Sequence, residues 1–195
     1  MLVPSLTLNV QINGGAIPPH TRCGMLFQDP SGREAEHGAV VDNNGHATFI
    51  GIPNGPCLVL AETPGQNQVA CKLVQIKGDE NVELHLQSTV SVAVTVIGNP
   101  IAKTSRLLFV DAANTNLLMG QIRDGSGDVK LIPGTYDIYV MLGKENNFLA
   151  QAKWQFKGDK GTTLNLNVAS PKPVSMSRIL ADVLRPHGGR NLPPP

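Results

Sequence analysis

Gly51-Ile52-Pro53-Asn54-Gly55 is the turn around which this sequence is arranged, and it recurs as Leu131-Ile132-Pro133-Gly134. In both places an apolar run stops at the Pro and Gly residues, and a second β-type run follows, at 58–61 and at 136–140. A strand, a tight turn and a second strand produce this pattern. We therefore interpret Pro53, Gly55, Pro133 and Gly134 as structural turn residues.

The similarity between the two stretches continues downstream of the turn. A shift of 80 positions aligns Lys77-Gly78-Asp79 with Lys157-Gly158-Asp159, and it also aligns Gln75 with Gln155. Upstream the offset grows by a few residues, as expected for insertions in loops, which tolerate them. The internal repeat predicts two tandem domains, at 1–87 and 88–168, and leaves a tail at 169–195 outside the repeat.

Each copy is expected to consist of short strands. Residues 6–12 alternate between apolar and polar types, which is the period of a half-buried strand, and Asn- and Gly-rich turn signals separate the later runs. Strands are expected at 6–12, 22–28, 38–42, 46–50, 57–62, 69–76 and 82–87, and at 90–97, 106–110, 117–123, 128–132, 136–142, 148–156 and 162–168. Seven strands per copy without helical periodicity predict an all-β fold of two tandem antiparallel β-sandwiches of the Greek-key, Ig-like type.

Several turn motifs also resemble those of a known family. The Leu-Phe-x-Asp strand end at 108–111, the Asn-Gly-x-Ala-x-Phe segment at 44–49 and the two Ile-Pro turns resemble the prealbumin-like sandwiches of carboxypeptidase regulatory-like domains and of B-type repeats in bacterial surface adhesins. The resemblance covers about residues 6–168. It implies a sandwich fold, and because its motifs are structural it implies no activity.

Composition excludes several classes of function. The net charge is +1 and the pI is about 7.8, so the chain lacks the strong positive field that attracts nucleic acids. The sequence has no apolar run long enough for a membrane helix, and it does not begin with the pattern of a signal peptide. We expect neither nucleic acid nor membrane as a partner.

No catalytic or metal site can be named from the sequence. The five histidines are dispersed without metal-ligand spacing, and neither a nucleophile elbow nor a carboxylate pair is present. We expect no cofactor and no enzymatic activity. For the aromatic residues two interpretations stay open: Trp154 belongs to the core, or it forms a sugar-binding face with Tyr136 and Tyr139.

The three cysteines, Cys23, Cys57 and Cys71, match no zinc or redox motif. One interpretation is that they are small apolar side chains in a reducing compartment. The other is a disulfide between Cys57 and Cys71, which a hairpin turning near Pro64-Gly65 would place about opposite one another.

The tail carries the only helical pattern. Apolar residues at helical spacing predict a short amphipathic helix at about 175–185, and a Pro-rich extended arm follows it. The apolar residues are Met176, Ile179, Leu180, Val183 and Leu184. Because a helix this short is marginal alone in water, its apolar stripe is expected to dock, either on its own second domain or on a partner subunit.

Two functional hypotheses follow from this organisation. The first is a non-enzymatic structural protein of a larger assembly, such as a capsid decoration or cement protein of a virion. It is made in the cytoplasm without a signal peptide, and the tail attaches it to a shell or to its own subunits in a homo-oligomer. The alternative is a secreted or cell-surface adhesion module that binds glycan or a host protein.

Overall fold

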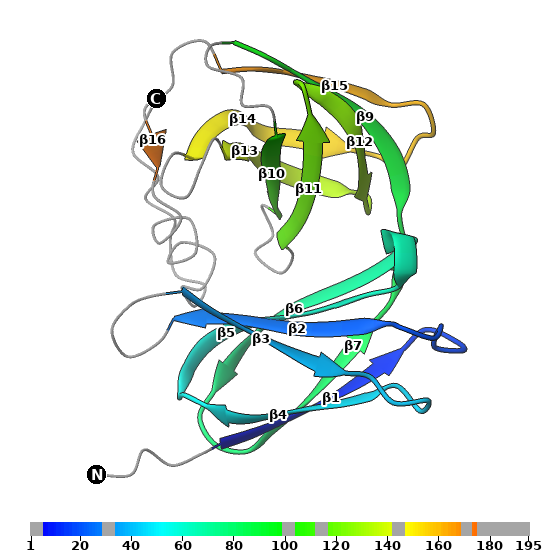
Figure 1. The fold of residues 1–195 in the computed structure, drawn as a ribbon, viewed down its shortest axis with the longest axis vertical. Coiled ribbons are helices and arrows are strands. Elements are labelled where there is room, and N and C mark those ends of the chain that lie inside the picture. Colours follow the sequence, from blue (N-terminus) through cyan, green and yellow to red (C-terminus); the bar gives the residue numbers. More distant parts are fainter. Residues whose placement is uncertain are drawn as a thin grey trace.

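The computed structural model describes residues 6–28, 34–98, 104–111, 117–141, 147–168 and 173–174. These residues form strands, their connections and one short 3-10 turn at Pro64–Gln66, and no α-helix occurs among them. The strands are arranged in two halves stacked along the long axis of the molecule (Figure 1). The prediction of an all-β chain is therefore confirmed.

The first half contains eight strands in two sheets. They are β1 (Leu6–Asn13), β2 (Arg22–Gln28), β3 (Glu34–Val40), β4 (His46–Ile52), β5 (Gly55–Glu62), β6 (Gln68–Ile76), β7 (Glu80–His85) and β8 (Gln87–Ser88). A small sheet has the order β4-β1-β7, and a large sheet has the order β3-β2-β5-β6-β8. The inward residues of β1 alternate as the sequence predicts: Leu8, Val10 and Ile12 are buried between the sheets.

The second half repeats this pairing pattern. Its strands are β9 (Val90–Ile97), β10 (Thr104–Asp111), β11 (Leu117–Arg123), β12 (Ser126–Leu131), β13 (Gly134–Met141), β14 (Asn147–Phe156), β15 (Thr163–Asn167) and β16 (Pro173–Val174). They form one sheet in the order β15-β9-β12-β11-β10-β13-β14-β16. Its core includes Val94, Phe109 and Leu166.

A two-residue turn explains why the second half forms one continuous sheet. Asp124 and Gly125 have φ values of 48° and 79°, which is the left-handed conformation of a tight hairpin turn with Asp-Gly at its centre. The turn pairs Arg123 with Ser126 and so joins β11 to β12. In the first half, β3 and β4 belong to different sheets.

Two expectations about the strands are wrong. The sandwiches are not purely antiparallel, because β1 pairs in parallel with β7, and β9 pairs in parallel with β15. The chain crosses from the large sheet to the small sheet before β7, and it therefore arrives beside β1 in the same direction. The third strand, expected at 38–42, instead spans 34–40, since it pairs with β2 from Arg22 to Gln28.

Asp42 lies in the turn after β3 rather than at the end of a strand. Its carboxylate accepts backbone N–H groups of His46 and Asn44, each at 2.8 Å. These hydrogen bonds lower the pKa of Asp42, the bond from His46 most strongly, because they stabilise the charged form. The residue therefore closes the β3–β4 connection.

Candidate functional site

The two anchor turns are built differently although they occupy equivalent positions. Gly55 has a φ of +137°, which favours glycine, and a Cβ there would meet no atom within 4 Å. Gly134 instead leaves space for an aromatic ring: a Cβ there would lie 3.0 Å from the ring of Tyr136. Both Pro53 and Pro133 lie in the turns, just before β5 and β13.

Tyr136 fixes the second anchor turn. Its side chain is fully buried, and its hydroxyl donates a hydrogen bond of 2.8 Å to the backbone carbonyl of Ile132 at the start of the turn. Desolvation raises the pKa of Tyr136 above its usual value, so the hydroxyl stays protonated and remains a donor. At the sequence offset of 80 positions the first half has Pro56, which has no hydroxyl to make this bond.

The expectation that Cys57 and Cys71 lie opposite each other across a hairpin is wrong. On the β5–β6 pair, Cys57 faces Val74 and Cys71 faces Leu60, so the two thiols are three residues out of register. They also lie on opposite faces, because Cys57 is in the first core and Cys71 packs against the second half. None of the three cysteines, including Cys23, forms a disulfide. Burial raises the pKa of each thiol to about 12, which keeps the thiols protonated near neutral pH.

The aromatic sugar-binding face is also wrong, and the core interpretation is confirmed. Tyr136 and Tyr139 are buried, with 1% and 7% of their surfaces exposed. Trp154 stacks on Phe156 with ring centroids 5.6 Å apart, and it packs against the core of the second half. The burial of Tyr136 and Tyr139 leaves no face of three aromatic rings for a sugar, and Trp154 is partly buried.

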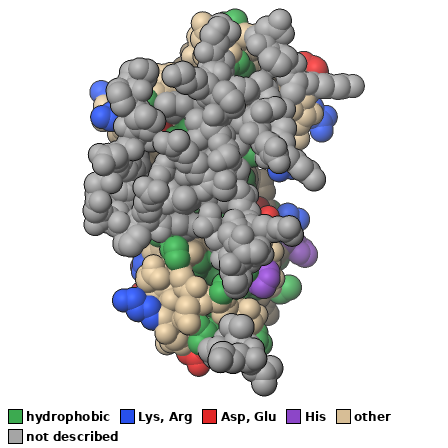
Figure 2. All heavy atoms as spheres, turned by 90° about the vertical axis from the view of Figure 1, so that its left-hand side faces the viewer, with side chains coloured by type: hydrophobic (Ala, Val, Ile, Leu, Met, Phe, Trp, Pro, Cys, Tyr) green, Lys and Arg blue, Asp and Glu red, His purple; other side chains and the backbone are tan. Residues whose placement is uncertain are grey.

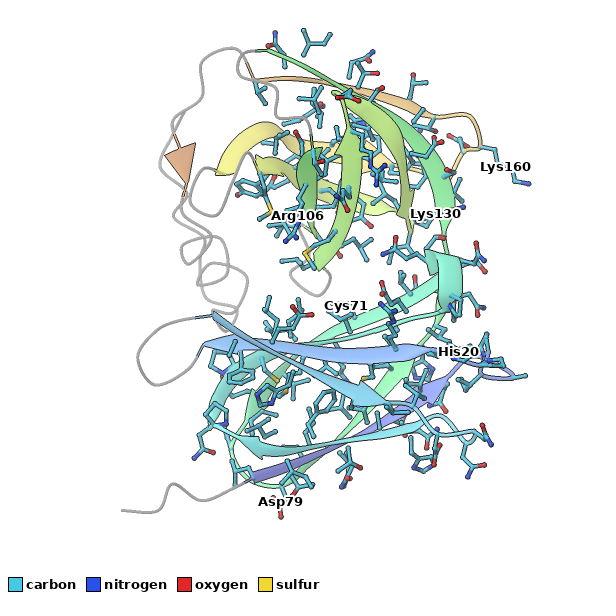
Figure 3. All side chains as sticks on the ribbon, in the orientation of Figure 1. His20, Cys71, Asp79, Arg106, Lys130 and Lys160 are labelled. Atoms are coloured by element: carbon cyan, nitrogen blue, oxygen red, sulfur yellow. The ribbon has the colours of Figure 1, made fainter. Side chains whose placement is uncertain are left out.

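The main feature that joins the halves is a hydrophobic contact, which we call the seam. Its buried residues come from β5, β10, β11 and β13, and they are Leu58, Leu108, Val110, Leu117 and Tyr139. Partly buried residues surround them: Leu26, Cys71, Leu73 and Met141. The outer face of the first large sheet thus packs on the outer face of β10, β11 and β13. Figure 3 shows Cys71 and Arg106 on either side of this junction.

The seam has a sequence signal that the strand predictions did not use. On β5, Val59 belongs to the first core while Leu58 belongs to the seam. On β10, Leu107 and Phe109 enter the second core while Leu108 enters the seam. Continuous apolar runs mark strands that are buried on both faces, whereas one-sided strands alternate. The runs at 57–61 and 107–110 therefore indicated a second packing surface.

One small cavity lies beside the seam. It has a volume of about 70 Å³, and its lining includes Glu62 and Cys71 from the first half and Leu117 and Lys130 from the second. Pockets that hold organic ligands are larger, about 300–1,000 Å³. The cavity is therefore a packing gap between the halves rather than a ligand site.

Metal-ligating side chains are dispersed among the described residues. No three His, Cys, Asp or Glu side chains among them are grouped to hold a metal ion. On the face shown in Figure 2, charged side chains of the described residues are scattered, and no large patch of one sign forms there. No helix in the described part of the chain is long and apolar enough to cross a bilayer.

The beginning of the tail is attached to the second half. Pro173 and Val174 form β16 and pair with Phe148 and Asn147 at the start of β14. The predicted helix and its apolar residues Met176, Ile179, Leu180, Val183 and Leu184 lie outside the described residues. β8 has the same relation to β6 in the first half, where Ser88 pairs with Gln68.

Comparisons with known proteins give only distant similarities. No protein-family model matches the sequence, and no curated protein matches it significantly. Among solved structures, a DUF3823 family protein from Parabacteroides merdae has a TM-score of 0.37 at 12% identity, over 71% of this chain and 92% of that one. The minor pilin of Streptococcus agalactiae has a TM-score of 0.31 at 14% identity, over 89% of this chain and 100% of that one. A shaft pilin from Lactobacillus rhamnosus GG has a TM-score of 0.27 at 8% identity, over 88% and 99%.

The chain is thus similar, at low identity, to β-rich proteins that include pilins. These TM-scores are too low for the likeness to identify a shared function, and they do not test the prealbumin-like assignment, which stays a prediction.

Proposed function

We propose that this chain is a non-enzymatic adhesion module of a cell surface or the extracellular space, built from two tandem copies of one β-sandwich domain. The observation that carries the proposal is the seam, which fixes the two halves against each other through buried side chains such as Leu58 and Leu108. A rigid body of this kind suits a protein that holds a binding face at a set distance and orientation from its attachment point.

The repeated strand pairing supports the division into two domains. Each half has a first strand that pairs antiparallel with the fourth and parallel with the seventh, as β1 does with β4 and β7, and β9 with β12 and β15. Each half also has a core built from its own strands, except that Val69 of β6 joins the core of the second half. On this proposal the two domains meet near Thr89, which lies between β8 and β9.

The chemistry of the described side chains supports a binding role rather than catalysis. The three thiols are held protonated by burial. The Ser105 hydroxyl is fully buried and has no hydrogen-bond partner, so no base activates it.

Localisation is the decisive test of this proposal. Antibodies against the purified chain should label the outer surface of the cells that produce it in immunogold electron microscopy, and protease added to intact cells should remove the label. Label confined to the cytoplasm would contradict the proposal.

A second candidate, a virion decoration protein attached through its tail, is favoured by one observation. β16 pairs residues 173–174 with the edge of β14, so the segment that this candidate assigns to a shell or a second subunit follows directly on a strand of the second half. In the same microscopy experiment, label on virus particles that disappears when residues 175–195 are deleted would favour this candidate.

A further inference from the structure

A row of polar side chains crosses the outer face of the first small sheet. Asn9 lies at the centre of the row on β1, directly between Thr48 on β4 and Asn81 on β7. The Thr48 hydroxyl donates to Asn9 Oδ1 at 3.2 Å, and Asn9 Nδ2 donates to Asn81 Oδ1 at 3.3 Å. All three residues are exposed. We call Thr48, Asn9 and Asn81 the amide row.

The amide row lies in a depression of about 340 Å³. A second row of side chains lies beside the amide row in this depression. In it, Gln11 on β1 pairs with His46 on β4 and with Glu83 on β7. The amide nitrogen of Gln11 donates to the carbonyls of Asn44 at 3.1 Å and Ile12 at 3.2 Å, which holds the side chain in place. The depression therefore has side chains that are already oriented before a ligand arrives.

The internal bonds leave much of the hydrogen-bonding capacity of the amide row unused. A primary amide has two N–H donors and an oxygen with two acceptor positions. The Asn81 amide uses one acceptor position in the row, and the Asn9 amide nitrogen uses one of its two hydrogens. Donors and acceptors thus alternate over a short distance on the exposed surface.

The charges in the depression restrict the class of ligand. No Lys or Arg lines it, so a phosphate or sulfate group would find no permanent cation there, while the Glu83 carboxylate would repel it. Ile50, on the same face of β4 as Thr48, has 70% of its surface exposed and offers an apolar contact. We propose that this face binds a neutral carbohydrate, whose hydroxyls both donate and accept and whose C–H groups pack on Ile50.

The second half shows that the fold does not need the amide row. The equivalent central position on β9 is Ala93, which lies between Asp128 on β12 and Thr163 on β15. Alanine has no polar side chain, so the row is interrupted, and the sheet forms nevertheless. The sheet therefore does not need an asparagine at the position of Asn9 in order to form. Asn9→Ala introduces the residue type that the second half has at the equivalent position.

The inference rests on the proposed binding function, because it names the ligand class of that module. The test is to titrate the full chain with oligosaccharides while NMR records its backbone and side-chain amide signals. The neutral probes are maltotetraose, cellotetraose, chitotetraose and mannotetraose. Dextran sulfate is the anionic comparison. At least one neutral oligosaccharide should shift the side-chain amide signals of Asn9 and Asn81. Asn9→Ala should weaken that binding about tenfold, the loss expected when two or more hydrogen bonds are removed.

Asn165→Ala is the matched control, since Asn165 is exposed on β15, in the corresponding region of the second half. It should bind as the unmodified chain does. If no neutral oligosaccharide shifts the Asn9 and Asn81 signals at millimolar concentrations, if Asn9→Ala binds normally, or if dextran sulfate binds there equally well, the inference is wrong. Such a result would leave the surface localisation of the protein untouched, so the two proposals fail separately.

Discussion

The seam makes a prediction about how the protein unfolds. Its five buried side chains contribute about 1.5–3 kcal/mol each when removed from water, so together they couple the halves by roughly 8–15 kcal/mol as an upper bound. A half of about 80 residues has an expected stability of about 4–12 kcal/mol on its own. Because the coupling is as large as the stability of either half, the full chain should unfold in one calorimetric transition, although the repeat alone suggests two.

Leu108→Asp should separate the halves. Leu108 is fully buried in the seam, and a carboxylate placed there is desolvated without a partner. Differential scanning calorimetry of this variant should show two transitions, one for each half. Leu108→Ala, which leaves no charge, should lower the melting temperature and broaden the transition without abolishing either core.

Leu107→Ala is the matched control for this experiment. Leu107 is equally buried but points into the core of the second half. Its truncation should lower stability by about 2–5 kcal/mol, yet the single transition should persist because the seam is intact. If the unmodified chain already melts in two well-separated steps, or if Leu108→Asp melts as the unmodified chain does, the seam does not couple the halves.

Four further outcomes are expected. Tyr136→Phe should lower the free energy of unfolding by about 1–3 kcal/mol in urea titrations, because it leaves the buried carbonyl of Ile132 without its donor; an unchanged midpoint would contradict the bond. Gly134→Val should cost about 1–3 kcal/mol by overpacking, since its Cβ would lie 3.0 Å from the Tyr136 ring, and equal stability would show that the ring moves freely. Because the thiol pKa values are about 12 in the folded chain, iodoacetamide at pH 8 should label none of the three cysteines there. In urea the thiol pKa falls to about 8.5, so all three should be labelled. Rapid labelling of the native protein would refute this burial. If the tail is the assembly element, deleting residues 175–195 or changing Leu180 and Leu184 to Asp should abolish attachment to a shell or to other subunits. Either change should leave the melting temperature nearly unchanged. Loss of folding would show instead that the tail stabilises its own chain.

The sequence predicted the strands well because each short strand is bounded by its own turn chemistry. The expected ranges 22–28, 90–97 and 117–123 coincide with β2, β9 and β11. Local signals of this kind depend on neighbouring residues only. The third strand was misplaced because residues 34–37 are mostly polar and form no apolar run, while its limits are set by pairing with β2.

Long-range pairing was less accessible to prediction. The parallel pairing of β1 with β7 joins residues about 72 positions apart, as in the register of Asn9 with Asn81, and no local pattern encodes it. The hairpin register that separates Cys57 from Cys71 was missed for a related reason. The 3-10 turn at Pro64–Gln66 and the pairing of Glu62 with Val69 fix that register, and both depend on the geometry of the whole connection.

The candidate surfaces follow from the way the halves are joined. The seam covers the outer face of the first large sheet and the outer face of β10, β11 and β13. The outer faces of β4, β1 and β7 and of β15, β9 and β12 are therefore left toward opposite ends of the molecule (Figure 1). The repeat supplies two equal scaffolds, yet the central residue is Asn9 at one end and Ala93 at the other. The two ends therefore differ chemically despite their common architecture. On the proposed function, such a chain binds its ligand through the first half and uses the second half, with the tail that starts at β16, as the part that faces its attachment point.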